Sequence, residues 1–555
     1  MAILAVVALG VAGEWDRLVG ATWLGMDTAT AFYPWYAFLG EQLRAGHIPT
    51  WNPHEFSGSP FAADPESGWM YLPAMLAFSL LPIEAAIRAH LLFHVLLAGL
   101  SAYGLARALG ANALGGLLAA TIYAHSGFFE GHNVCCYAYT DVAAWLPMLL
   151  LGAELAIRAS SWRSRALFWG VAGLALSQIL AAWIGQGAYY ALLVLGSFVA
   201  YRCLVSTPGA VGRRLAGVAL HGAGVLVFGF GLGAAGVLPR VAYDIESNLP
   251  GGYPSADVSL MATSWSDWGL IDGLDGLLLS PGFEYIGWPT LLLALLAPLV
   301  ARRLACVAYF GGLAVAVLIL ARAEPTPLHA ALALLPGFER IHARSPERIL
   351  IVFYLAPAFL AAATLTWLTQ RQRLRVFAQL SGIVVVAAVA WDLHFAWEAQ
   401  AAVALAGGGD YEFRRVDLAT YFAPTPAARF LLSNSDGQPF RYFGYAGHVF
   451  GGPMPYTLRW ADRSITALEV NNRGLMTGLD DVQGYNPVHL ARYDWLMSSL
   501  NGHDQNYHHA DIFDSGFDSP LLDLLNVRYV LMPATLASDE VAPHYQRPWR
   551  GVYSD

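Results

Sequence analysis

Long hydrophobic runs alternate with short polar segments over the first 393 residues of the chain. A transmembrane helix needs about 20 apolar residues, and the pattern predicts about eleven spans, of which the first is short. The predicted spans are residues 1–13, 85–106, 110–128, 141–157, 166–184, 187–204, 215–237, 286–301, 304–321, 349–368 and 377–393. The chain is therefore expected to be a polytopic α-helical membrane protein.

The segment between the first two predicted spans, residues 14–84, is too polar to cross a bilayer and too patterned to be a simple connection. Phe32, Trp35 and Phe38 recur at helical spacing, which predicts an amphipathic helix that ends near Gly46. Beside a bilayer, such a helix is expected to lie in the membrane interface. The turn-forming sequences that follow are Trp51-Asn52-Pro53, Gly58-Ser59-Pro60 and Asp64-Pro65.

The last part of the chain, residues 394–555, has a different composition and contains no run of span length. Alternating, β-rich stretches are mixed there with stretches of helical periodicity. The expected strands lie near 441–445 and 526–531, and the expected helices near 417–432 and 487–500. The sequence therefore predicts two domains: a membrane domain, 1–393, that includes the first loop, and a mixed α/β domain, 394–555.

Composition and charge support a membrane protein and give it an orientation. Hydrophobic residues make up 56% of the chain and charged residues only 13%, against about 25% charged residues in soluble proteins. A net charge of −9 does not fit a nucleic-acid partner, which requires basic stripes. The arginine clusters fall in alternate loops, which the positive-inside rule places in the cytoplasm. The first loop, residues 129–140 and the C-terminal domain are then outside.

Three arginines depart from this rule. Arg340, Arg344 and Arg348 recur every four residues before a span, on the outer side where positive charge is disfavoured. Guanidinium groups hold phosphate through planar bidentate contacts, so a phosphate-binding role is one interpretation. The other is snorkelling, or pairing with neighbouring glutamates.

Histidines and acidic residues give weaker signals. His90 and His94 lie one turn apart in the second span and could bind a metal or relay protons. No third ligand is near them in sequence, so packing between helices is favoured and no metal site is predicted. His132, in the outer loop 129–140, is a candidate substrate contact. The carboxylates Asp244, Glu246, Asp257, Asp267, Asp272 and Asp275 favour a solvated loop over a cation site.

The first loop also carries a series of short motifs in a distinctive order. They are Asp27, Tyr33-Pro34-Trp35, Gly46-His47-Ile48-Pro49, Trp51-Asn52-Pro53, Gly58 and Pro60-Phe61. Together they resemble the first outer loop of the YfhO-like bacterial membrane proteins. The likeness continues with His132, Leu335-Pro336-Gly337-Phe338, Arg344 and Leu524-Leu525-Asn526-Val527-Arg528-Tyr529. Members of that family usually carry a further C-terminal span, and this sequence ends at Asp555 before one.

The YfhO-like family resembles the GT-C class of glycosyltransferases, which take a sugar from a polyprenyl-phosphate carrier outside the cytoplasmic membrane. The resemblance implies a lipid-linked sugar as donor, a cell-envelope glycan, lipid or protein as acceptor, and no cofactor. It also implies a place in the bacterial cytoplasmic membrane. In the GT-C class an acidic residue of the first outer loop is the expected catalytic group, and Asp27 matches that position. Asp64 is the second candidate acid. The expected substrate contacts are Tyr33, Trp35, Trp51, Asn52, His54, His132, Arg340, Arg344 and Arg348.

Two alternatives remain at this point. Asp27 precedes a predicted helix, where an N-cap aspartate contributes about 1 kcal/mol, and a capping role would explain it without any chemistry. A lipid or polysaccharide transporter without catalysis is the competing function. Transporters often show inverted repeats and polar groups at the membrane midplane. The sequence has no evident repeat, and its polar residues collect at the outer face, which favours an enzyme.

Overall fold

The computed structural model describes residues 1–250, 284–302, 304–322, 326–343, 345–370, 375–407, 413–435, 437–447, 456–533 and 535–536. Within it, the chain forms two compact units. The membrane unit consists of Met1–Val19, Arg88–Val237 and Gly252–Val403. The loop unit consists of Gly20–Ile87, Leu238–Gly251 and Ala404–Asp555.

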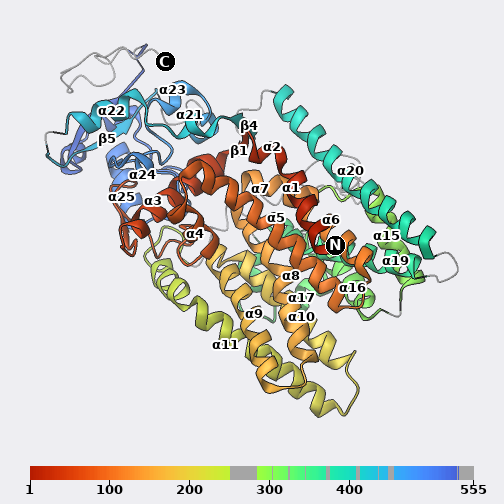
Figure 1. Ribbon diagram of the computed structural model, residues 1–555. Helices are drawn as coiled ribbons and strands as arrows, with labels where there is room; N and C mark the ends of the chain where they lie inside the picture. The colour runs from red at the N-terminus through yellow and green to blue at the C-terminus, as the bar shows by residue number, and fades with distance from the viewer. Residues whose placement is uncertain are drawn as a thin grey trace. The chain divides into compact units, whose positions relative to one another are not determined.

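The membrane unit is built from helices (Figure 1). In chain order they begin with α1 (Ala2–Gly13), α2 (Trp15–Leu18), α5 (Ile83–Ala108), α6 (Ala113–His125), α7 (Gly127–Cys135), α8 (Tyr137–Arg158), α9 (Trp162–Ala182), α10 (Gln186–Leu204) and α11 (Val211–Asp244). They continue with α15 (Trp288–Val300), α16 (Ala305–Leu320), α17 (Pro327–Leu332), α18 (Phe338–His342), η2 (Pro346–Val352), α19 (Leu355–Thr369) and α20 (Arg375–Gly407).

Seven helical segments in the described residues are long and apolar enough to cross a membrane by length and composition. They are Ile83–Ala108, Tyr137–Arg158, Trp162–Ala182, Gln186–Leu204, Val211–Asp244, Pro346–Thr369 and Val376–Ala399. Each coincides with a predicted span, and the protein is a multi-pass membrane protein. The remaining predicted spans correspond to the shorter helices α1, α6, α15 and α16. The count of eleven and the orientation remain predictions.

The centre of the membrane unit is α19, which packs against α6, α15 and α16. The span to which it belongs is entirely buried, whereas the α11 and α20 spans are mostly exposed. Small residues allow the close packing: a Cβ added to Gly115 of α6 would lie 2.6 Å from the Ala362 carbonyl oxygen of α19. The exposed side chains of α20, such as Phe377 and Trp391, are large and apolar, as expected for a surface against lipid.

A buried charge network joins the short helix α2 to α6 and α7. One guanidinium nitrogen of Arg17 lies 2.9 Å from both carboxylate oxygens of Glu14 and 2.8 Å from a carboxylate oxygen of Glu130. His125 lies 2.8 Å from the other oxygen of Glu130. The indole of Trp397 covers the Arg17 guanidinium at 4.3 Å. Because Arg17 is only 2% exposed, its charge is balanced by protein groups and not by water.

The loop unit combines the first loop with the C-terminal region. Its first-loop elements are β1 (Thr22–Gly25), the π-helical turn η1 (Thr28–Phe32), α3 (Tyr33–Arg44), β2 (Trp51–Asn52), β3 (Ser59–Pro60) and α4 (Leu72–Leu80). Its C-terminal elements are β4 (Phe413–Val416), α21 (Leu418–Phe422), α22 (Pro426–Ser433), β5 (Arg441–Gly444), η4 (Tyr456–Arg459), α23 (Arg463–Thr466), α24 (Gly474–Thr477), α25 (Ala491–Asn501), η5 (Asp514–Gly516), α26 (Leu521–Leu524) and β6 (Val527–Leu531).

Strand pairing ties these two parts of the sequence together. β1 pairs antiparallel with β4, with Thr22 opposite Val416. β2 and β3 form a small antiparallel hairpin within the first loop, and β5 and β6 pair in parallel. The core of the unit mixes both parts, since Phe56 packs among Phe443, Tyr445, Val482 and Met497. The first loop and the C-terminal region therefore share one hydrophobic core.

The secondary-structure elements expected in the C-terminal region are present: the expected strands coincide with β5 and β6, and the expected helices overlap α21, α22 and α25. The division into 1–393 and 394–555 remains a prediction about domains. The structure adds that residues 20–87 pack with the C-terminal region, a grouping that the sequence did not suggest.

The predicted amphipathic helix is present as α3, but its expected environment is wrong. Gly46 follows it with φ +75°, as a C-terminal stop requires. Its apolar stripe, however, is covered by protein: Trp35, Phe38 and Leu39 are almost fully buried, and the Phe38 ring packs on Phe61. The stripe is therefore part of the protein core and is not the surface that would rest on lipid.

Candidate active site

A segment of the C-terminal region, residues 480–486, runs along the first loop. The backbone amide of Phe56 donates to the Gln483 carbonyl at 2.9 Å, and that of Ser57 donates to the Asp481 carbonyl at 3.1 Å. Gly484 lies against the Phe56 ring so closely that an added Cβ would come within 2.5 Å of it. We call residues 480–486 the clamp segment, because its side chains bind both candidate acids of the first loop.

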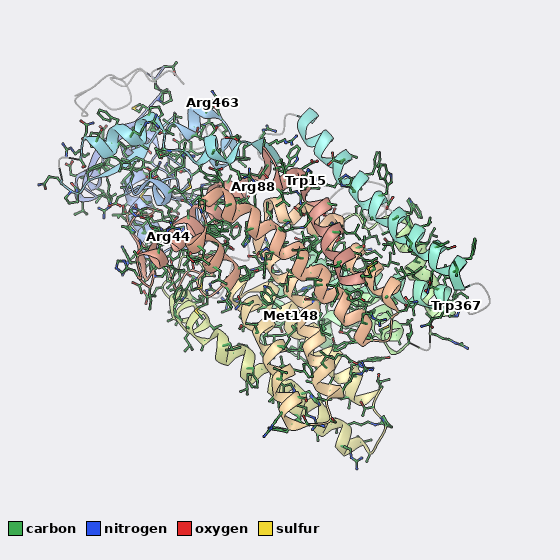
Figure 2. The ribbon with its side chains drawn as sticks, viewed as in Figure 1. Trp15, Arg44, Arg88, Met148, Trp367 and Arg463 are labelled. Carbon is green, nitrogen blue, oxygen red and sulfur yellow. A yellow bond between two sulfur atoms is a disulfide. The ribbon has the colours of Figure 1, made fainter. Side chains whose placement is uncertain are left out.

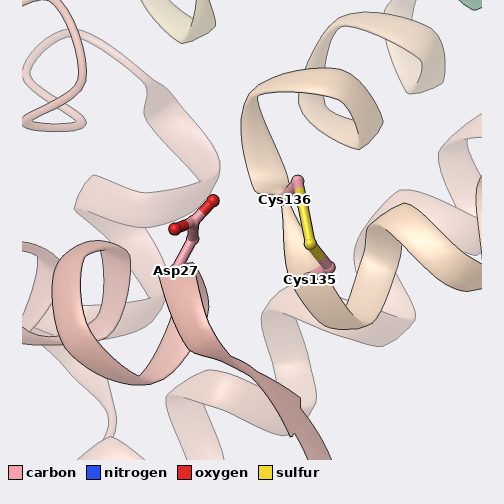
Figure 3. A group of neighbouring side chains, drawn as sticks. All are labelled: Asp27, Cys135 and Cys136. Atoms are coloured by element: carbon pink, nitrogen blue, oxygen red, sulfur yellow. A yellow bond between two sulfur atoms is a disulfide. The ribbon is translucent and has the colours of Figure 1, made fainter. Parts of the chain in front are cut away.

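Asp27 is held by the clamp segment and does not cap a helix. It has helical backbone angles, φ −64° and ψ −36°, and its side chain makes no capping hydrogen bond to η1. Instead, the hydroxyl of Tyr485 donates to Asp27 Oδ1 at 3.0 Å. Figure 3 shows the carboxylate projecting from the start of this helix, and also draws the disulfide between Cys135 and Cys136 where α7 meets α8. The capping alternative is therefore wrong for this residue.

The position of Asp27 follows from the local sequence. Gly25 ends β1, and the Thr28 hydroxyl donates to its carbonyl at 2.9 Å while accepting from its amide at 3.1 Å. This closes a tight turn between the strand and η1, with Asp27 inside it. Asp27 and Tyr485 are both half-buried, so the carboxylate keeps some access to solvent and is oriented by a neutral hydroxyl.

Asp64 occupies a different environment. It is buried, its Oδ1 accepts from the Glu66 amide at 2.7 Å, and its Oδ2 accepts from the Asn486 side chain at 2.6 Å. The guanidinium of Arg240 donates to its backbone carbonyl at 3.2 Å. Burial raises the pKa of Asp64 to about 6, against the opposing hydrogen bonds and the Arg240 charge. These contacts indicate that Asp64 stabilises the loop. Asp27 is the more accessible of the two candidate catalytic residues.

A third acid, Glu55, binds two of the predicted substrate contacts. The Trp35 indole donates to Glu55 Oε2 at 3.1 Å, and the Asn52 amide donates to Oε1 at 2.9 Å. The Ser59 hydroxyl lies 3.3 Å from Oε1. Burial raises the pKa of Glu55 to about 8, although these hydrogen bonds oppose the shift. Trp35 and Asn52 are buried around this carboxyl group, so their visible role is to order the loop.

The remaining first-loop candidates divide by exposure. Tyr33 is fully buried, with its ring against Phe78 and Phe422. His54 is partly exposed, and its Nδ1 donates to Asp480 Oδ1 of the clamp segment at 2.9 Å. Trp51 is 49% exposed on β2. Among these predicted contacts, Trp51 and His54 keep surface that a ligand could reach.

The predicted contacts in the membrane unit form a separate cluster. Arg348 donates to the Gln186 side chain at 3.0 Å, and its guanidinium lies over the rings of Tyr139 and Trp183 at 5.8 Å and 5.7 Å. The ring of His132 lies 4.6 Å from that of Tyr139. Its Nδ1 donates to the Phe128 carbonyl at 2.8 Å, and burial lowers its pKa to about 4. His132 is therefore neutral at physiological pH.

Arg340 and Arg348 lie in different environments. Arg340 lies exposed on α18, whereas Arg348 is half-buried against aromatic rings. Arg344 lies outside the described residues. Of the acidic outer loop, Asp244 and Glu246 are exposed, as a solvated loop requires, while Asp257, Asp267, Asp272 and Asp275 lie outside the described residues.

Comparison with known proteins identifies solved structures that resemble this chain. The chain is similar to the oligosaccharyltransferase of Archaeoglobus fulgidus, solved in its apo form, with a TM-score of 0.51 and 13% sequence identity over 95% of this chain and 69% of that one. The chain therefore shares the fold of that oligosaccharyltransferase. It also matches the arabinofuranosyltransferase AftD from Mycobacteria, with a TM-score of 0.48 and 14% identity. That match covers 80% of this chain and 29% of AftD.

Comparison by sequence identifies no relative of this chain. No protein-family model matches the sequence, and no curated protein does. The resemblance to the YfhO-like family therefore remains a prediction. At 13% identity, the likeness to the oligosaccharyltransferase shows the fold alone.

Sequence analysis missed the clamp segment and Glu55. The available signal was the sequence Asp480-Asp481-Val482-Gln483-Gly484-Tyr485-Asn486-Pro487, which places four polar side chains next to a turn. Polar residues at such density in a domain with a hydrophobic core often have buried partners. The partners of Tyr485 and Asn486 could not be read from spacing, because they lie more than 400 positions away.

The buried acids make a pH dependence of stability testable. Burial raises the pKa of Glu55 to about 8 and that of Asp511 to about 7, from usual values of 4.5 and 3.8. The folded state then binds these protons more tightly than the unfolded state. The resulting stability is complete below pH 4 and is lost as the pH rises through the folded-state values. One proton changes the free energy of unfolding by about 1.4 kcal/mol per pH unit. Glu55 alone should therefore lower the free energy of unfolding by about 2 kcal/mol as the pH rises from 5.5 to 7.5.

Hydrogen exchange of residues 20–87, followed from pH 5.5 to 7.5 and corrected for intrinsic exchange rates, measures this loss. In the Glu55→Gln variant, the slope of stability against pH should be shallower by the contribution of about one proton, because a neutral amide does not titrate. Stability that rises with pH in the wild type, or an unchanged slope in the variant, would contradict the assignment.

Proposed function

We propose that the protein is a membrane glycosyltransferase. It would move a sugar from a polyprenyl-phosphate-linked donor to a cell-envelope glycan, lipid or protein on the outer face of the bacterial cytoplasmic membrane. The observation that carries this proposal is Asp27: in a GT-C-like fold, the first loop holds a half-buried carboxylate through the Tyr485 hydroxyl, and that carboxylate caps no helix.

The chemistry assigned to Asp27 is that of a general base. Its carboxylate would take the proton of the acceptor hydroxyl while the acceptor oxygen forms a bond to the anomeric carbon. The bond from that carbon to the carrier phosphate breaks, and polyprenyl phosphate leaves with the electron pair. The transition state resembles an oxocarbenium ion, as in glycoside hydrolysis. The hydrogen bond from Tyr485 would fix the direction of the carboxylate.

Arg348 is the residue of the membrane unit that we assign to the donor phosphate. Its guanidinium is positioned by Gln186 and by the Tyr139 and Trp183 rings, and a fixed cation would stabilise the negative charge that grows on a leaving phosphate. Arg340 lies exposed on α18, where water would screen its charge.

This assignment gives a prediction with a matched control. Arg348→Ala should raise the KM for the lipid-linked donor about tenfold to a hundredfold, as expected for the loss of a charged hydrogen bond of about 1.5–3 kcal/mol. Arg348→Lys should fall in between, because it keeps the charge but loses the planar fork. Arg340→Ala should change KM by less than about twofold. Steady-state transfer kinetics with the three variants measure this, and equal effects at both positions would contradict it.

The experiment that tests the function is sugar transfer in proteoliposomes. The purified full chain would be supplied with radiolabelled sugars on polyprenyl phosphate and with envelope acceptors, and the products would be separated by size. Transfer that requires the protein supports the proposal. Movement of the lipid-linked sugar across the bilayer, without formation of a product, would instead identify a transporter.

A further inference from the structure

Two histidines and an aspartate meet inside the membrane unit. His90 and His94 lie one turn apart on α5, with their rings 4.2 Å apart, and Asp141 lies on α8 just beyond its first turn. His94 Nε2 is 3.1 Å from Asp141 Oδ1, and His90 Nε2 is 4.0 Å from the same oxygen. All three side chains are buried, and one ligand atom from each lies within 4.8 Å of the other two.

The hydrogen bond of His94 determines which of its nitrogens faces the carboxylate as an acceptor. His94 Nδ1 is 2.6 Å from the backbone carbonyl oxygen of His90. A carbonyl oxygen only accepts, so Nδ1 carries the hydrogen, and in the neutral ring Nε2 has a lone pair. That nitrogen lies 3.1 Å from a carboxylate oxygen of Asp141. Two acceptors at this distance in a buried site require a cation, either a proton or a metal ion.

We propose that His90, His94 and Asp141 bind a divalent transition-metal ion of the zinc type. Zinc binds imidazole nitrogen and carboxylate oxygen at about 2.0–2.2 Å, which separates neighbouring ligand atoms of a tetrahedral site by roughly 3.3 Å. The shorter observed separation is close to that value, and the longer one needs a small rotation of the His90 ring. The proposal does not rest on the proposed function.

The surroundings fit a metal site in two further respects. The His90 carbonyl orients the His94 ring and presents its Nε2, which is the arrangement commonly found around metal-bound histidine. Two imidazoles and one carboxylate leave at least one coordination position for water or another ligand. A bound ion would join α5 to α8 across the interior of the unit, so its first effect should be on stability.

The contribution of His90 to binding distinguishes a metal site from a proton shared by His94 and Asp141. A protonated His94 paired with Asp141 would satisfy both partners without His90, whose Nε2 lies 4.0 Å from the carboxylate. A metal site requires all three ligands. Binding that depends on His90 as much as on His94 is therefore the property to measure.

The test uses the full chain in detergent, with any affinity tag removed and metals stripped by a chelator. Cobalt(II) and zinc(II) are titrated, and cobalt binding is followed by its visible absorption. We expect one equivalent to bind in the wild type. His90→Gln, His94→Gln and Asp141→Asn should each weaken binding at least tenfold. His221→Gln removes a buried histidine on α11 that hydrogen-bonds Trp169, and should leave binding unchanged.

A measurement on the wild type alone covers the case in which a variant does not fold. Stripping the metal should lower the melting temperature by several degrees, and zinc should restore it. The proposal is overturned if the stripped wild type binds no cobalt, or if His90→Gln binds cobalt as tightly as the wild type. It is also overturned if chelation and zinc leave the melting temperature unchanged. Any of these results would leave a proton as the cation shared by His94 and Asp141.

Discussion

Replacing Asp27 with asparagine is expected to reduce sugar transfer by two to three orders of magnitude, the scale of a lost general base. Asparagine keeps the shape of the side chain and can still accept from the Tyr485 hydroxyl, so the clamp segment should stay in place. The substitution removes the negatively charged group that would take the proton from the acceptor. The loss should therefore fall on kcat, with little change in the KM for the donor.

Two further variants separate catalysis from the ordering of the loop. Tyr485→Phe removes only the hydroxyl that orients Asp27, and should cost about tenfold or less in transfer, in line with the roughly 1 kcal/mol of one neutral hydrogen bond. Asp64→Asn changes the buried acid and should act mainly on stability. The assay needs equal amounts of folded protein for each variant. Transfer that survives Asp27→Asn but not Asp64→Asn would make Asp64 the base and overturn the assignment.

The largest effect on stability is expected at Arg17. Arg17→Met should lower the free energy of unfolding by about 3–5 kcal/mol, because it leaves Glu14 and Glu130 buried without their cation. Methionine fills much of the same volume and can still pack against Trp397, so the loss would come from charge and not from a cavity. Thermal or denaturant unfolding in detergent measures it.

An exposed arginine serves as the matched control. Arg163→Met on α9 should change the free energy of unfolding by less than about 0.5 kcal/mol. Combining Arg17→Met with Glu14→Gln should be less damaging than the sum of the single changes, because the second change removes one of the unpaired charges. Equal stability losses for Arg17→Met and Arg163→Met would show that the network contributes little.

The sequence predicted the membrane helices well because their signal is local. A bilayer requires a continuous apolar run, and each of the seven long helices coincides with one. The same holds for β5, β6 and α25, whose periodicity lies within a few consecutive residues. The environment of α3 was mispredicted for a related reason: an apolar stripe indicates that something covers the helix, but a bilayer and a protein core give the same pattern.

The candidate site could be predicted only in part. Asp27 was found through a motif, yet its partner Tyr485 comes from 458 positions further along the chain. His90 and His94 were recognised by their spacing, while Asp141 joins them through the packing of α5 against α8. Both cases involve side chains brought together by tertiary structure alone. Pairs of this kind leave no periodicity or spacing in a single sequence.

The pairing of β1 with β4 has a consequence for biosynthesis. Arg415 donates to the carbonyl of Ala21, 394 positions earlier, so the first loop cannot complete its core until nearly the whole chain has been made. At about 5–20 residues per second, synthesis of the intervening segment takes roughly 20 to 80 s. During that interval Phe56 lacks Phe443, Val482 and Met497, which pack around it in the folded protein. A newly made chain should therefore depend on a chaperone or on the membrane surface to protect the loop, and truncation before residue 413 should leave it sensitive to protease.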